Sequence, residues 1–139
     1  VLFNALEEGH GQALSERLRR LEVRREDLMV GCLTDLARVI TVARDMDAAA
    51  VIFDSWSYMR NVDAEDLARV QREAGAATVT VLHATKDGQH RGSMSLLHAA
   101  DAVVELDAGR WRRTKSRYSP CAEGELPWVT SPITPASFA

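Results

Sequence analysis

Short apolar runs alternate with amphipathic patterns along most of this chain, and that alternation restricts its fold more than any other feature. We expect strands over residues 1–3, 27–30, 49–53, 78–82 and 102–106. Between them, apolar residues recur at intervals of three and four, the spacing that predicts a helix with one buried face. Strands that alternate with helices indicate an α/β fold with a mainly parallel sheet and right-handed crossovers.

Two helices carry sequence signals at their ends. Thr34 can act as the N-cap of a helix whose apolar residues recur up to Ala43. Asp63 can cap a later helix, and Gly75 can end it, because glycine readily adopts the left-handed conformation that follows a helix.

The last part of the chain has a different pattern. Asp107-Ala108-Gly109 predicts a turn that joins the strand 102–106 to a second strand over residues 110–115. All four prolines follow, beginning with Pro120. We therefore expect residues 120–139 to form an irregular tail with one short strand near Trp128.

Composition suits a globular protein, with 139 residues, 46% of them hydrophobic and 27% charged. This length predicts one domain over residues 1–139. The net charge of −3 excludes a basic field over the whole molecule, so DNA binding would need a local patch. No apolar run reaches membrane-spanning length, so we expect no membrane association. The distant cysteines, Cys32 and Cys121, favour free thiols and a cytoplasmic location.

Polar residues follow three of the expected strands: Glu7 the first, Asp54 the third and His83 the fourth. Ligands of parallel sheets bind beyond the carboxyl ends of the strands, so this shared placement indicates a site. An aspartate at the end of an apolar strand can hold magnesium in ATPases, but it can also simply cap a turn. Glu7 or its neighbour Glu8 could activate water. Alternatively, both could simply lie at a helix N-terminus, where the helix dipole favours acidic residues.

Basic residues offer two further candidate contacts with phosphates. Lys86 and Arg91 lie in the polar segment after His83, which could also be a solvated loop. The second group is the run that contains Lys115 and Arg117, where a solvated basic edge strand is the alternative. No metal-ligand partner lies at a useful spacing along the chain from His83, His90 or His98, which argues against zinc.

The order of these features resembles RadA/Sms-type DNA repair proteins, which have a RecA-like ATPase core. The matching segments are VLFNALEEG at 1–9, VIFDS at 51–55, VLHATKDG at 81–88, LLHAADAVVEL at 96–106 and TKSRYS at 114–119. The last segment is similar to the Lys-Asn-Arg-Phe-Gly signature of that family. It keeps the charged members, Lys115 and Arg117, and differs at Ser116, Tyr118 and Ser119.

The resemblance implies a role for each matched residue. Glu7 would be the general base, with Glu8 as its substitute, while Asp54 would bind magnesium with support from Ser55. His83 and Thr85 would sense the γ-phosphate of ATP. Lys86 and Arg91 would face single-stranded DNA in the pore of a ring, and Lys115 and Arg117 would reach the nucleotide of the adjacent subunit.

The function implied is an ATP-dependent DNA repair or recombination ATPase that forms a homo-oligomeric ring on single-stranded or branched DNA. The sequence has no GxxxxGK[ST] phosphate-binding loop, which the family would place before Val1. We therefore expect ATP hydrolysis from the complete protein and none from these 139 residues alone. Two alternatives remain, a non-catalytic RecA-like oligomerisation or partner-binding module and a KaiC- or DnaB-like ATPase.

Overall fold

The computed structural model describes residues 1–8, 11–20, 22–23, 26, 28–83 and 94–126. The chain divides into two compact units, Val1–Leu96 and Leu97–Ala139, where the sequence predicted one domain. None of the helices in these residues is long and apolar enough to cross a membrane.

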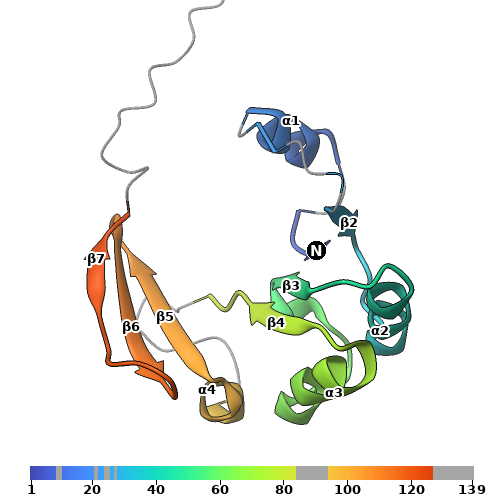
Figure 1. Cartoon of the computed structure of the whole chain (residues 1–139). Helices are drawn as coiled ribbons and strands as arrows, with labels where there is room; N and C mark the ends of the chain where they lie inside the picture. Colours follow the sequence, from blue (N-terminus) through green and yellow to red (C-terminus); the bar gives the residue numbers. More distant parts are fainter. Residues whose placement is uncertain (9–10, 21, 24–25, 27, 84–93, 127–139) are drawn as a thin grey trace, which may run out of the picture. The chain divides into compact units, whose positions relative to one another are not determined.

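The first unit contains a parallel sheet, as predicted, and this sheet has four strands (Figure 1). The expected fifth strand, at 102–106, lies in a separate antiparallel sheet. Its strands are β1 (Leu2–Ala5), β2 (Met29–Gly31), β3 (Ala50–Asp54) and β4 (Ala77–Thr80). Their order in the sheet is β2-β1-β3-β4, so β1 and β3 are central and adjacent. The carboxyl ends of β1, β3 and β4 therefore lie at one edge of the sheet, next to one another.

The helices of this unit follow the predicted alternation. They are α1 (Gln12–Arg20), α2 (Leu36–Asp45), a short 3-10 helix (Trp56–Tyr58), α3 (Ala64–Ala74) and α4 (Met94–Ala99), the last of which spans the boundary between the units. Helix α2 buries one face, formed by Leu36, Val39, Ile40 and Ala43. This face packs in a core with Val51 and Phe53 of β3, both fully buried. The core thus fixes the strand that ends at Asp54.

The predicted caps were correct for one helix and wrong for the other. Asp63 caps α3 through the backbone N–H of Glu65, and Gly75 ends it with a φ of 70°, as expected. Helix α2 is capped by Asp35 instead of Thr34, because the Asp35 carboxylate accepts hydrogen bonds from two backbone N–H groups of the first turn. A carboxylate at this position also interacts favourably with the helix dipole.

The second unit contains an antiparallel sheet of β5 (Ala102–Asp107), β6 (Arg110–Ser116) and β7 (Glu123–Glu125), in that order. The hairpin between β5 and β6 is confirmed. Its loop residues, Ala108 and Gly109, have φ values of 42° and 82°, as a type I′ turn requires.

One expectation for this region was wrong. The basic strand β6 is the central strand of its sheet and not an edge, because it pairs with β5 on one side and β7 on the other. The tail, which was expected to be irregular apart from one short strand near Trp128, contains the short strand β7 at Glu123–Glu125. Trp128, near which a strand was predicted, lies outside the described residues.

Candidate functional site

Three side chains from three strand ends converge at one edge of the parallel sheet. Glu7 follows β1, Asp54 ends β3 and His83 follows β4. Each contributes one potential ligand atom, and these atoms all lie within 4.8 Å of one another. The structure therefore brings together the three polar strand ends that the sequence singled out.

Backbone hydrogen bonds hold these strand ends in register. The carbonyl oxygen of Asp54 accepts hydrogen bonds from the N–H groups of Leu6 and Glu7, at 2.7 and 3.0 Å. On the other side, Val81 N–H donates to the carbonyl of Phe53 at 2.9 Å, two residues before His83. The convergence is thus built into the sheet and does not depend on the side chains alone.

The closest side-chain contact in the cluster joins His83 to Glu7. His83 Nε2 lies 2.7 Å from Glu7 Oε2, a distance that requires a hydrogen between them. The side chain of His83 is 48% exposed and that of Glu7 is 40% exposed. Both groups can therefore meet water or a ligand from solution.

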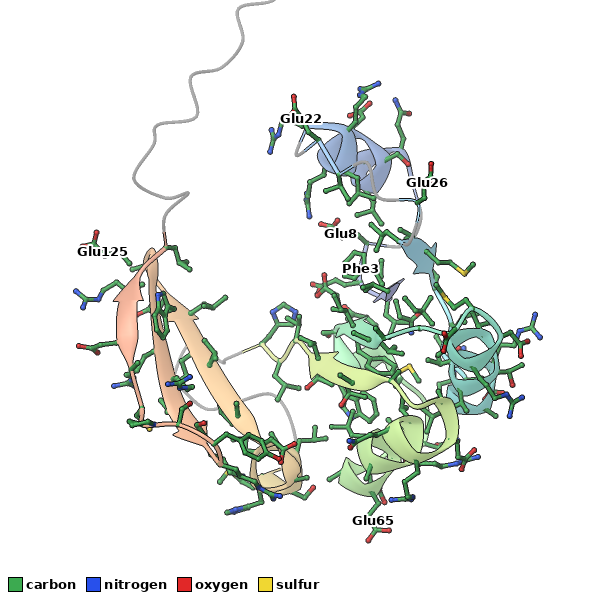
Figure 2. All side chains as sticks on the ribbon, viewed as in Figure 1. Phe3, Glu8, Glu22, Glu26, Glu65 and Glu125 are labelled. Carbon is green, nitrogen blue, oxygen red and sulfur yellow. The ribbon has the colours of Figure 1, made fainter. Side chains whose placement is uncertain are left out.

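The cluster carries more negative than positive charge. Burial raises the pKa of the Asp54 carboxyl, and the nearby Glu7 and Glu8 carboxylates raise it further. His83 and Arg17 act in the opposite direction but do not compensate. Arg17 of α1 already forms an ion pair with Glu8, since its guanidinium lies 2.7 Å from the Glu8 carboxylate. Figure 2 shows Glu8 between α1 and Phe3 of β1. A bound cation would relieve this repulsion.

Ser55 is fully buried beside the cluster. Its hydroxyl lies 2.7 Å from the Ser57 hydroxyl, within the 3-10 turn that follows β3. The peptide bond between Asp54 and Ser55 is cis. Ser55 therefore contacts the turn that begins directly behind Asp54.

Lys115 and Arg117 lie in the second unit, where each has a partner. Lys115 Nζ donates hydrogen bonds to the carbonyls of Leu97 and His98, near the end of α4, at 2.8 and 2.7 Å. Arg117 lies 3.3 Å from the carboxylate of Asp101. These contacts stabilise the unit itself, because a lysine can satisfy the free carbonyls at a helix end. An action of either residue on a neighbouring subunit stays a prediction.

Thr85, Lys86 and Arg91 lie outside the described residues.

Sequence reasoning missed Asn4, which is fully buried in β1. Its side-chain amide donates to the carbonyl of Leu33 and accepts from the N–H of Leu33, both at 2.8 Å. This pair of bonds ties the chain after β2 to the strand that leads to Glu7. A lone polar residue inside an apolar strand was the available signal.

Comparisons with known proteins add no assignment. No model of a known protein family matches the chain, and a search of curated proteins finds no match.

Proposed function

We propose that this chain contributes the residues that bind magnesium and activate water in an ATP hydrolase site of the RadA/Sms type. The protein would act in DNA repair or recombination as a ring on single-stranded or branched DNA. The observation that carries the proposal is the convergence of Glu7, Asp54 and His83 at the carboxyl ends of three adjacent parallel strands. Open parallel sheets bind their ligands at this edge.

The arrangement supports the role in magnesium binding that the resemblance implies for Asp54. An apolar strand buried in the core ends at Asp54, which offers a carboxylate oxygen of the kind that magnesium prefers. Burial raises the pKa of Asp54, and the Glu7 and Glu8 carboxylates raise it further; a cation bound to Asp54 would offset both effects. When bound with ATP, magnesium would neutralise charge on the phosphates.

Glu7 is the stronger of the two candidates for the base that takes a proton from water. His83 is hydrogen-bonded to the Oε2 atom of Glu7, and no other described side chain donates a hydrogen bond to this carboxylate. Glu8 is instead engaged by Arg17 at 2.7 Å. His83 would therefore orient the Glu7 carboxylate and leave Oε1 to accept the proton.

A non-catalytic RecA-like oligomerisation or partner-binding module is the second candidate. This candidate holds if the protein that contains these residues has no GxxxxGK[ST] loop to cradle phosphates. The two candidates differ in whether the carboxylate cluster has any effect on ATP.

The test is a Glu7→Gln substitution in the natural protein that contains these residues, compared with Glu8→Gln. We expect Glu7→Gln to keep ATP binding and to lower DNA-stimulated hydrolysis about 10²–10⁴-fold, because an amide cannot accept the proton. Glu16→Gln, on the exposed surface of α1, serves as the control.

Two outcomes would contradict this assignment. Normal hydrolysis by Glu7→Gln with loss in Glu8→Gln would transfer the role to Glu8. If the protein hydrolyses no ATP with or without DNA, the non-catalytic candidate replaces the first.

A further inference from the structure

We infer that Glu7, Asp54 and His83 bind a first-row transition-metal dication such as Zn²⁺ directly, without nucleotide and in preference to Mg²⁺. The inference goes beyond the proposed function, in which magnesium is bound together with ATP, because it concerns the site when no nucleotide is present. Binding itself needs neither ATP nor DNA, so it can be tested separately.

The donor set favours such an ion. The cluster offers one imidazole nitrogen and two carboxylates, and Zn²⁺ sites that act on substrates have three protein ligands of these kinds and one open position. Mg²⁺ prefers oxygen ligands and retains several waters, so the nitrogen of His83 adds little to its binding. The imidazole therefore separates this site from one built for magnesium alone.

The geometry is close to what a bound ion requires. Ligand atoms about 2.0–2.2 Å from Zn²⁺ lie about 3–4 Å from each other in a tetrahedral site. Here they lie within 4.8 Å, and the His83 and Glu7 atoms are only 2.7 Å apart. The ion would replace the hydrogen between Nε2 and Oε2. A small rotation of the half-exposed side chains would complete the site.

The backbone keeps the three ligands near one another before the ion binds. Glu7 and Asp54 are joined through the hydrogen bond from Glu7 N–H to the Asp54 carbonyl. His83 is linked to the same region by two bonds of Val81, from its N–H to Phe53 and from Trp56 N–H to its carbonyl. Folding therefore already brings the ligands close together, which reduces the conformational entropy that is lost when the metal binds.

The ligands come from distant parts of the sequence, which explains why spacing along the chain argued against zinc. His83 and Glu7 are 76 residues apart. Among the described residues, this is the only group of three metal-ligating side chains close enough to share an ion.

Isothermal titration of the 139-residue chain with Zn²⁺ tests the inference. Cys32→Ser and Cys121→Ser are introduced in all samples, so that thiols cannot bind the metal. We expect one Zn²⁺ per chain, and Mg²⁺ in 100-fold excess should not displace it. Co²⁺, a spectroscopic substitute for Zn²⁺, should give visible absorption bands that Zn²⁺ abolishes.

Single substitutions identify the ligands. We expect His83→Ala, Asp54→Asn and Glu7→Gln each to weaken Zn²⁺ binding by at least about tenfold, since even loss of a residue that only supports a ligand weakens metal sites by 10–100-fold. His98→Ala is the matched control, because His98 is an exposed histidine of the other unit. The affinity of this variant for Zn²⁺ should equal that of the unsubstituted chain. Circular dichroism should be used to check that each variant is folded.

The inference is overturned if the chain does not bind Zn²⁺, if Mg²⁺ competes equally, or if His98→Ala weakens binding as much as His83→Ala. Failure of the proposed function looks different. Zn²⁺ binding in a protein without ATP hydrolysis would refute the ATPase alone. Hydrolysis that depends on Glu7 in a protein that binds no Zn²⁺ would refute the metal site alone.

Discussion

Asp54→Asn should make the metal-free protein more stable, although it removes the central residue of the proposed site. The carboxylate of Asp54 is half-buried and close to those of Glu7 and Glu8, and both burial and repulsion raise its pKa above the ordinary value of 3.8. Among the described residues, none donates a hydrogen bond to this carboxylate. An asparagine keeps the shape and removes the charge.

The magnitude follows from the distance to Glu7. Two unit charges within 4.8 Å repel by about 1 kcal/mol in a water-like dielectric and by about 3.5 kcal/mol at an effective dielectric of 20. The 40% exposure of the Glu7 side chain favours the lower end of this range. We therefore expect Asp54→Asn to raise the free energy of unfolding by about 1–2 kcal/mol at pH 7.

The dependence on pH has a definite sign. Because the pKa of Asp54 is higher in the folded protein than in the unfolded chain, protonation stabilises the fold. The contribution of Asp54 is most favourable below pH 3.8 and is lost as the pH rises through the raised pKa of the folded state. The asparagine variant lacks this loss, so its advantage over the wild type should grow from acid to neutral pH.

Urea unfolding followed by circular dichroism, in the presence of EDTA, measures this difference. Glu16→Gln is the control, because Glu16 is exposed on α1, and its effect should stay within about 0.5 kcal/mol. An Asp54→Asn protein that is no more stable than the wild type at neutral pH would refute the account of the cluster as a site of uncompensated charge. An advantage that does not change with pH would refute it equally.

Two further substitutions test the architecture around the site. Asn4→Ala should lower the free energy of unfolding by about 1–3 kcal/mol in urea titrations, because it removes both 2.8 Å hydrogen bonds between the buried Asn4 side chain and the partly buried backbone of Leu33; an Asn4→Ala protein as stable as the wild type would contradict this role. Gly124→Ala should displace the indole of Trp111, since a Cβ at Gly124 would lie 2.7 Å from Nε1 of that ring, and an unchanged indole N–H resonance in the NMR spectrum would contradict this packing.

Patterns confined to one segment identified most of the elements. The apolar run before Asp54 predicted β3, Asp63 and Gly75 predicted the ends of α3, and the turn before Arg110 predicted the hairpin. In each case the signal lies in the residues that form the element. The N-cap of α2 was misplaced by one residue, because Thr34 and Asp35 are both good caps and the sequence does not show which side chain reaches the first turn.

Strand partners could not be predicted in the same way. Strand β7 has the sequence Glu-Gly-Glu, with no apolar or β-branched residue to mark it as a strand. It forms because β6 offers backbone groups to pair with, so the central position of β6 was also missed. The division of the chain after Leu96 depends on which contacts form, and composition does not reveal it.

The sequence by itself determined that Glu7, Asp54 and His83 each lie at or just after the end of a strand, because the end of an apolar run is a local property. The tertiary structure decided that these three strands are adjacent, that the ligand atoms lie within 4.8 Å, and that Arg17 engages Glu8 and not Glu7. The physical reason is that strand order and side-chain contacts arise from hydrogen bonds and packing between segments far apart in the chain, and a linear pattern carries little information about them.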